Sequence, residues 1–427
     1  MRSDRWDAVF ACSAAYMNSR LAEESANYAF SFRYEDAGVI LEGVFDAWSI
    51  APNGSGEILQ FYTPIKSGSA TLKGTNKTHK LDGAIPLVQM QLGFIDGANP
   101  GQQKSLVFNC RTVGSKMGDR TTGAVTVLEA DTSGKVGLDA LAKDFIVPAL
   151  SQCFVDNRDK LAFVFADIAL TPTEHANWMV LRSLAYCYQQ DVQDALGNFG
   201  VLGMFDHVDI SGYSKTFDSS LLQQGDDFGF ILSGTQLMAH VILPGLPDGF
   251  RGSSAGEFQM MGARIVNRGH IQLESVRVGL IWYPPHINNL DMHIENNYIS
   301  VYLDGHCPFS GLDDAYIDFS MSEREVAGFD LEAEAFSFYP IDRQVTHSTY
   351  IPWWEKLLGW LTFGLMNAII EAVGLAIEYA VSSRVSGSGL DATNLGAFQV
   401  KWQPGAKFRL TDGGLQDNFY CRGKRQP

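Results

Sequence analysis

The chain has 427 residues, of which 46% are hydrophobic and 19% charged, so it is long enough for two cores or one elongated body. Its 32 Lys and Arg against 48 Asp and Glu give a formal net charge of −16, which argues against a nucleic-acid partner because phosphates require a basic surface. The same acidity argues against broad adsorption to anionic lipid headgroups.

The first half of the chain is predicted to alternate between helix and strand regions. Residues 6–24 have apolar side chains at three- and four-residue spacings, which predicts a first helix with Asp7 as its N-cap. From residue 28 to about 127, apolar and polar residues alternate between turn-forming clusters, as is typical of antiparallel strands. Residues 136–154 return to helical spacing.

The second half repeats this segregated pattern. Strands are predicted in three stretches, 161–232, 258–339 and 398–421. Between them lie a short apolar segment at 237–250 and the most apolar stretch of the chain, 353–381. Runs of strands separated from helices indicate an α+β protein.

Two ten-residue segments resemble each other. Phe145–Phe154 and Val241–Phe250 share Ile, Pro, Leu and Phe at matched positions. A proline inside an apolar helical pattern either kinks the helix or lies in its first turn. Two interpretations stay open, a repeated device that bends a helix onto a curved sheet and a chance match between apolar segments.

The apolar stretch from 353 to 381 is long enough to cross a bilayer. Its polar residues follow one stripe of a helix: Asn367, Glu371, Glu378 and Ser382. Glutamates facing lipid are costly, so we expect the helix to lie on a curved sheet with this stripe in water. The pair Trp353-Trp354 at its start fits either an interfacial anchor or a core contact.

The six cysteines are scattered without a CxxC pair, which predicts reduced, mostly buried thiols rather than a disulfide framework or a zinc site. The first residues contain no uninterrupted apolar segment of the Sec-signal type, so synthesis and folding in the cytosol are expected, with later release left open.

The sequence lacks the usual nucleotide-binding and zinc-protease motifs. It contains no GxxxxGK[ST] loop and no HExxH helix. The segment 212–216 does not match a GxSxG elbow, because its last residue is not glycine. The spacing of His286 and His293 matches no metal-ligand motif. The Asp226-Asp227 and Asp313-Asp314 pairs are typical of solvated turns. We therefore predict no enzyme activity, no cofactor and no metal, with an active site built from distant residues as the open alternative.

Three features, in chain order, resemble the clostridial P47 family. They are the opening Arg5-Trp6-Asp7 with Asn18 and Leu21, the segment Val241–Pro247, and the Trp353-Trp354 entry into a long apolar helix. The family usually opens with Gly-Trp-Asp, so Arg5 departs from it, while the Trp-Asp pair is kept. The resemblance extends over essentially the full chain.

The resemblance implies a fold and a class of function. P47 proteins belong with the OrfX proteins of neurotoxin gene clusters and adopt the TULIP fold, in which a highly twisted antiparallel sheet wraps a long helix. We therefore expect an elongated α+β protein of highly twisted antiparallel sheets around long helices. It would form a single unit over 1–427, or two subunits of the fold at about 1–235 and 236–421, followed by a basic tail at 422–427.

Eukaryotic TULIP proteins carry lipids between helix and sheet, so the resemblance implies a non-enzymatic protein that interacts with lipid. Its P47 and OrfX relatives imply that it is a component of a bacterial, insecticidal toxin system. We expect it to be made in the bacterial cytoplasm. The alternative is a protein-interaction component of a binary toxin or complex, with a closed groove and no lipid cargo. The expected partners are a lipid or fatty acid and a partner toxin protein, without nucleic acid and without a transmembrane span. The candidate groove residues are Phe145, Leu150, Phe154, Val241, Leu246, Phe250, Leu357, Leu361, Leu365, Ile369 and Val373.

Overall fold

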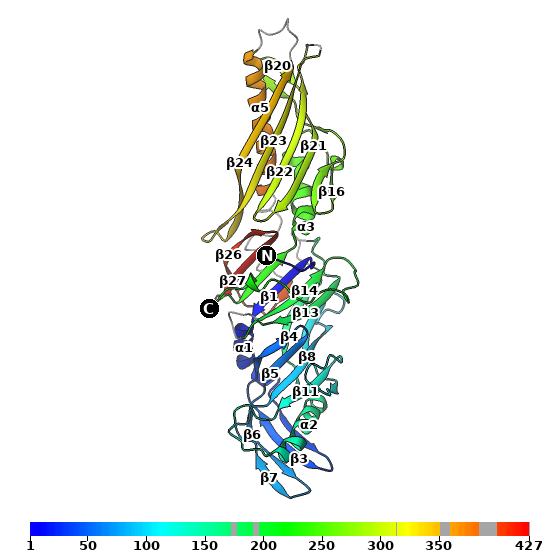
Figure 1. Ribbon diagram of the computed structural model, residues 1–427, viewed down its shortest axis with the longest axis vertical. Coiled ribbons are helices and arrows are strands. Elements are labelled where there is room, and N and C mark those ends of the chain that lie inside the picture. Colours follow the sequence, from blue (N-terminus) through cyan, green and yellow to red (C-terminus); the bar gives the residue numbers. More distant parts are fainter. Residues whose placement is uncertain (172–176, 191–195, 313, 351–358, 384–398, 427) are drawn as a thin grey trace.

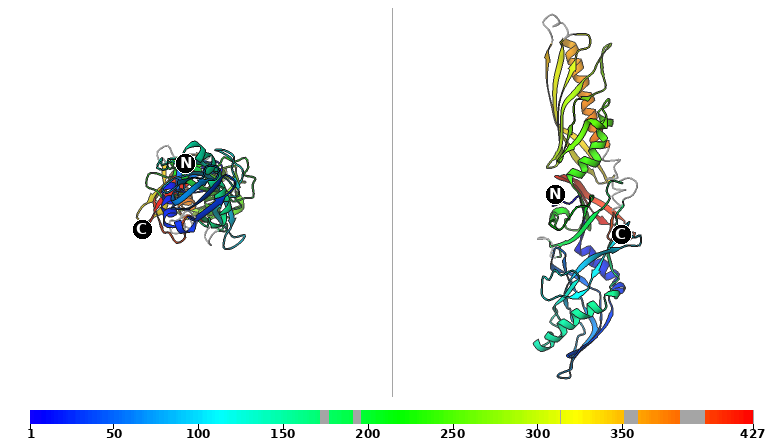
Figure 2. Two further views of the ribbon diagram at one scale, coloured as in Figure 1. Left: turned by 90° about the horizontal axis from the view of Figure 1, so that it is seen from below. Right: turned by 90° about the vertical axis from the view of Figure 1, so that its right-hand side faces the viewer.

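The computed structural model shows a long, narrow molecule whose sheets follow one another along its length (Figures 1 and 2). It describes residues 1–171, 177–190, 196–312, 314–350, 359–383 and 399–426, without the side chains of 359–362, 382 and 383. These ranges contain five sheets, in which the paired strands are antiparallel except for β10 (Thr112–Val113) with β11 (Ala124–Glu129). The predicted α+β class with curled antiparallel sheets is confirmed.

A six-stranded sheet occupies the middle of the molecule and contains segments from both ends of the chain (Figure 1). In spatial order its strands are β13 (Ser183–Gln189), β14 (Asn198–Met204), β1 (Ala8–Ser13), β15 (Phe228–Leu232), β27 (Asn418–Arg425) and β26 (Phe408–Gln416). Strand β1 pairs with β14 and β15, and β15 also pairs with β27. The first and last segments of the chain therefore complete each other's backbone hydrogen bonding.

The prediction of a helix over residues 6–24 is wrong for its first half, which contains strand β1. Helix α1 (Ala14–Glu23) begins after Ser13, whose side chain is the N-cap. The carboxylate of Asp7 instead accepts a hydrogen bond from the backbone N–H of Phe205 at 2.9 Å. All six residues of β1 are buried, so apolar side chains occupy both faces of the strand and imitate helical spacing.

The basic residues predicted as a tail do not form a separate end of the chain, because Arg422, Lys424 and Arg425 belong to β27 in the central sheet. Arg422 is buried there and forms ion pairs with Asp226, at 3.7 Å, and with Asp412. A buried guanidinium requires such partners, whereas an exposed tail would not have them. The positive charge near the C-terminus is thus part of the structure of the sheet.

One end of the molecule consists of two sheets and helix α2 (Figure 1). The eight-stranded sheet contains β10, β11, β8 (Leu87–Asp96), β9 (Gln103–Asn109), β12 (Val164–Ala169) and β25 (Val400–Lys401), with β5 (Ile58–Tyr62) paired to β8 and β4 (Ser49–Ser55) to β5. The four-stranded sheet contains β2 (Ser31–Glu35), β3 (Val39–Phe45), β6 (Ile65–Leu72) and β7 (Lys77–Lys80). Helix α2 (Ala140–Asp156) packs on strands of both sheets and confirms the helix predicted at 136–154.

The other end is a seven-stranded sheet with helix α5 (Gly359–Glu378) packed against it (Figures 1 and 2). Its strands are β16 (Phe258–Met261), β17 (Arg264–Asn267), β21 (His286–Glu295), β22 (Tyr298–Pro308), β23 (Tyr316–Asp330) and β24 (Ala335–Tyr350), with β18 (Ile271–Gln272) beside β21. A separate hairpin of β19 (Val276–Val278) and β20 (Ile281–Tyr283) also contacts α5 through β19.

Helix α5 has one buried face and one polar edge. The buried side chains are Leu365, Met366, Ile369, Val373, Ala376 and Ile377. Asn367, Glu371 and Glu378 are exposed, which confirms the predicted polar stripe, while the side chain of Ser382 lies outside the described residues. Within the described residues, Phe363–Val381 is the one helix long and apolar enough to span a membrane by length and composition, and 50% of that segment is buried inside the protein.

The two similar proline segments are both helical but differ in detail. Helix α2 remains α-helical across Pro148. The second segment changes helix type along its length: α3 (Gly234–Leu237), a π-helical turn (Met238–Ile242), a 3₁₀ turn (Leu243–Gly245) and α4 (Leu246–Gly249). Pro244 and Pro247 have no N–H to donate, so a continuous hydrogen-bond ladder cannot form there.

The remaining described helical turns are short, at Ser25–Asn27, Arg158–Lys160, Ser219–Leu221, Ala255–Glu257 and Tyr379–Ser383. All six cysteines are free and buried, as predicted.

We predict that Arg422→Ala lowers the free energy of unfolding by about 3 kcal/mol, because it leaves Asp226 buried without its cationic partner. Lys424→Ala is the matched control, since Lys424 belongs to the same strand and is exposed. We expect the control to change stability by less than about 0.5 kcal/mol in urea denaturation. Equal, small effects of the two variants would contradict the buried position of Arg422.

Candidate functional site

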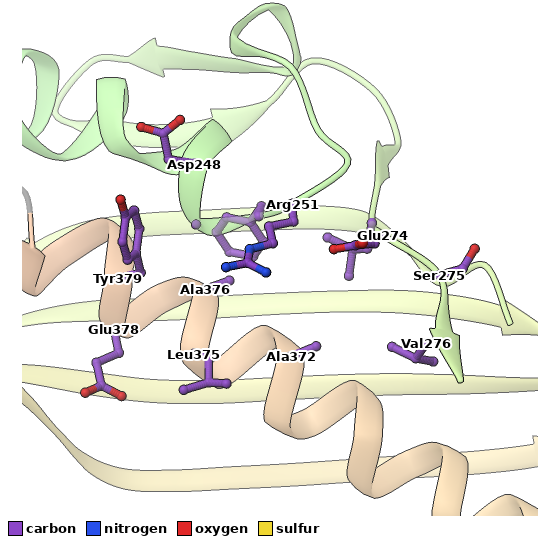
Figure 3. Close-up of a pocket in the computed structure, with 13 residues that line it drawn as sticks. Asp248, Arg251, Glu274, Ser275, Val276, Ala372, Leu375, Ala376, Glu378 and Tyr379 are labelled. Atoms are coloured by element: carbon purple, nitrogen blue, oxygen red, sulfur yellow. The ribbon is translucent and has the colours of Figure 1, made fainter. Parts of the chain in front are cut away.

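A cavity of about 730 Å³ lies between α4, α5 and the segment that leads into β19 (Figure 3). This volume falls within the range of small-molecule sites in proteins. Its floor is formed by the buried side chains of Phe250, Leu273 and Ala376. Leu375, 58% exposed, and Tyr379 line it from α5 and from the turn that follows. The cavity is therefore largely apolar and open to solvent.

Two glycines allow the three elements to approach one another around the cavity. A Cβ at Gly249 would overlap the backbone carbonyl of Ala376, so only glycine lets α4 lie this close to α5. Gly252 has φ of +94°, and a Cβ there would lie 2.6 Å from the backbone nitrogen of Glu274. That nitrogen donates a hydrogen bond to the carbonyl of Arg251 at 2.6 Å, which joins the end of α4 to the segment that leads into β19.

Charged side chains stand at the edge of the cavity. In Figure 3 the guanidinium of Arg251 extends from the end of α4 toward Ala376, with Glu274 on the facing segment, while Glu378 points away. Among the residues that the structure describes, no carboxylate forms an ion pair with Arg251, which is exposed. A guanidinium in this position can bind a phosphate or a carboxylate of a ligand in fork geometry.

Behind α5, the sheet contains two buried acids. Glu323 is fully buried and forms an ion pair with Arg343 at 2.7 Å. The Arg343 guanidinium also packs under α5, where a Cβ at Gly374 would lie 2.6 Å from its Nη1. Glu325 is buried, and neither of its carboxylate oxygens has a hydrogen-bond partner among the described residues.

Burial, and after it the charges of Glu323 and Glu378, raise the pKa of Glu325 to about 8, against a partial opposing effect of Arg343. A buried carboxyl group avoids the cost of an unpaired charge by remaining protonated. Glu325 is therefore neutral at pH 7 and allows the apolar face of α5 to lie over it.

Comparison with known proteins places the chain in a family. A family model described as OrfX-like, Protein OrfX2/OrfX3/P47, matches residues 3–392. The chain belongs to this OrfX-like family. Protein P47 of Clostridium botulinum (strain Kyoto / Type A2) is 24% identical over 409 residues, which cover 89% of this chain and 94% of that protein.

Two solved structures have the same fold as this OrfX-like protein. P47 from C. botulinum A2 superposes with a TM-score of 0.83 at 21% identity, covering 99% of this chain and 98% of the other. P47 of C. botulinum E1 gives a TM-score of 0.82 at 20% identity, with 99% of both chains covered. The OrfX-like family is not a known enzyme family.

The residues that carried the resemblance near the N-terminus have structural roles. Trp6 is fully buried, and its indole N–H donates to the carbonyl of Ser214 at 2.9 Å. The Asn18 side-chain oxygen accepts from the backbone N–H of Ile50 at 2.7 Å, and its amide donates to the Ile50 carbonyl at 3.4 Å. These contacts connect α1 to β4 and Trp6 to the segment between β14 and β15, far from the cavity.

The predicted groove residues fall into two groups at opposite ends of the molecule (Figure 1). Leu150 and Phe154 are buried on α2, whereas Phe145 is 38% exposed. Val241, Leu246, Phe250, Leu365, Ile369 and Val373 are buried at the α5 end. Leu357 and the side chain of Leu361 lie outside the described residues, as does the Trp353-Trp354 pair.

The candidate groove residues therefore do not line one slot, because α2 and α5 lie at opposite ends of the molecule (Figure 1). Of the candidates that the structure describes, Phe250 is the one that lines the cavity. Apart from the exposed Phe145, the others are buried in the core, since the apolar periodicity that selected them marks the buried face of a helix. Sequence reasoning missed Arg251 and Glu274, for which the only signal was the glycine pair around Phe250.

We predict that Glu325→Gln stabilises the protein at pH 8 by about 1–3 kcal/mol and has little effect at pH 5. The pKa of Glu325 is raised from 4.5 to about 8 in the folded state. Between these values the folded protein holds more protons than the unfolded chain, so stability falls as the pH rises through this window. Glutamine cannot ionise and removes this decline.

Thermal unfolding from pH 5 to pH 9 measures the effect, with the exposed Glu371→Gln as control. Parallel stability curves for wild type and Glu325→Gln would show that Glu325 does not ionise in this range.

Proposed function

We propose that this OrfX-like protein binds the acyl chain of a lipid in the cavity between α4, α5 and the segment before β19, and that it performs no catalysis on it. The observation that carries the proposal is an open cavity with an apolar floor and, at its charged edge, the Arg251 guanidinium, which lies beside Asp248, Glu274 and Glu378. Apolar walls with a few polar groups are the usual composition of small-molecule sites. An acyl chain with a phosphate or carboxylate end matches both parts.

The energetics favour a chain over water in this cavity. Phe250, Leu273 and Ala376 offer water few hydrogen-bond partners, so water gains little there. Each buried CH₂ contributes about 0.8 kcal/mol, so ten of them contribute about 8 kcal/mol before the cost of ordering the chain. The Arg251 guanidinium adds a charge-assisted contact to an anionic headgroup.

The exposed hairpin of β19 and β20 supports the entry of a lipid from a membrane into the cavity. Leu280 at its turn is 87% exposed, and Ile281 and Trp282 are exposed beside it. Val276, in the same hairpin, lines the cavity. Exposed apolar side chains of this kind mark interaction surfaces, and tryptophan favours the bilayer interface.

The family supports a wider proposal, that the protein serves as an accessory or component of a bacterial, insecticidal toxin system. The exposed hairpin side chains also fit the second candidate, a protein-interaction component without lipid cargo. Vesicle binding and stable complex formation with a partner toxin protein distinguish the two candidates. A complex without lipid binding would favour the second.

We predict that Ala372→Trp abolishes saturable binding of a fluorescent fatty acid, because Ala372 lines the cavity and an indole would fill it. Asn367→Trp is the matched control, since Asn367 lies on the exposed edge of the same helix and outside the cavity lining. Circular dichroism checks that both variants fold. If wild type shows no binding at saturating probe, the lipid proposal fails and the protein-interaction candidate replaces it.

We predict that Arg251→Gln weakens binding of an anionic acyl lipid by about tenfold, the effect of losing one charge-assisted contact. Binding of the matching alcohol, which lacks the negative charge, should not change. Arg268→Gln is the control, since Arg268 lies outside the cavity lining and contacts Gln259 at 3.0 Å. Equal loss with the charged lipid and the alcohol would show that Arg251 shapes the cavity rather than binding the headgroup.

A further inference from the structure

Three histidines form a row on the exposed face of the seven-stranded sheet. His286 on β21 and His306 on β22 are directly paired across the strands, and their ring centroids are 5.3 Å apart. His270, just before β18, has its ring centroid 5.2 Å from that of His286. In sequence they are far apart, and only the pairing of β18, β21 and β22 brings them together.

The spacing of these rings matches the geometry of a shared metal ion. Imidazole nitrogens bind zinc at about 2.1 Å in tetrahedral geometry, which places the centroids of two bound rings about 5 Å apart. The observed separations of 5.2 and 5.3 Å fit this requirement without movement of the strands. His270 is exposed and the other two rings are partly exposed, so an ion can reach them from solvent.

The carboxylate of Asp318, on the neighbouring strand β23, contacts one histidine of this row. Asp318 on β23 is paired with His306 in the sheet, and its Oδ1 is 2.8 Å from His306 Nδ1. A carboxylate on one ring nitrogen fixes the orientation of the imidazole and directs the other nitrogen, Nε2, to a metal. His306 therefore has, on one ring nitrogen, the carboxylate contact that metal-binding histidines usually make through the nitrogen that does not bind the metal.

We propose that His286 and His306 chelate a divalent cation of the zinc class, that His270 completes the site by turning its ring toward the same ion, and that Asp318 orients His306. Among the described residues, no group of three or more His, Cys, Asp and Glu side chains already converges on one point, so the third ligand needs this ring rotation. Imidazole ligands suit Zn²⁺, Cu²⁺ and Ni²⁺ rather than Mg²⁺ or Ca²⁺.

The position of this site gives the metal a structural effect on the cavity. His270 precedes β18 and the cavity-lining segment from Leu273 to Val276, and His286 follows the β19–β20 hairpin. A metal that joins His270 to His286 adds a cross-link at the base of the hairpin segment, where β18 already pairs with β21. Cross-links of this kind reduce the conformational freedom of the enclosed segment. The ion thus stabilises one wall of the cavity, whether or not the cavity holds a lipid.

The test uses the full-length protein without an affinity tag, freed of metal with a chelator and titrated calorimetrically with Zn²⁺. We expect one saturable site per chain. His286→Ala and His306→Ala should each weaken it at least tenfold, and Asp318→Asn by about 10–100-fold. His347→Ala, on an exposed position of β24, and His293→Ala, whose ring contacts Asp291 at 2.6 Å, are controls that should bind as wild type does.

Hydrogen exchange with and without Zn²⁺ tests the effect on the hairpin. We expect slower amide exchange in residues 270–286 of the wild type and no change in His286→Ala. Absence of saturable binding by the wild type, or the same loss of affinity in His347→Ala, overturns the site. Binding without slower exchange overturns its effect on the cavity wall. Both results are independent of lipid binding.

Discussion

The backbone pairing of β1 with β14 and β15, and of β15 with β27, is the constraint on which the rest of this molecule depends. It places strands from residues 8–13 and 418–425 in the same sheet, and both termini lie midway along the molecule (Figure 1). The two ends of the protein extend from this sheet in opposite directions. Because every residue of β1 is buried, the sheet is part of the core on both faces.

At one end, the cavity results from elements that cannot pack completely. Helix α4 ends at Gly249, and the close approach of Gly249 to α5 leaves Arg251 and Phe250 at the margin of the contact. Helix α5 in turn leaves Leu375 exposed on the side of the cavity. An apolar surface that is neither packed nor covered is the physical basis of the proposed lipid binding.

The same helix lies over a buried carboxyl group. Glu325 has no hydrogen-bond partner among the described residues, and the Glu323–Arg343 ion pair beside it does not compensate its charge. A protonated Glu325 makes the packing of α5 compatible with a sheet that contains two buried acids. The packing of α5 is therefore expected to weaken when Glu325 ionises at alkaline pH. The histidine row on the exposed face of the sheet is a separate feature of β18, β21 and β22.

The sequence by itself determined the segregation of strands and helices, the buried cysteines, and the polar stripe of Asn367, Glu371 and Glu378, because these features follow from local periodicity and composition. Local periodicity misassigned β1, whose two buried faces resemble a helix, and it selected core residues such as Leu365 and Ile369 for the site. The tertiary structure alone decided the cavity around Arg251, the burial of Arg422 and the row of His270, His286 and His306. Each of these depends on strands or helices distant in the chain, and the register that brings them together arises only when the whole sheet has formed.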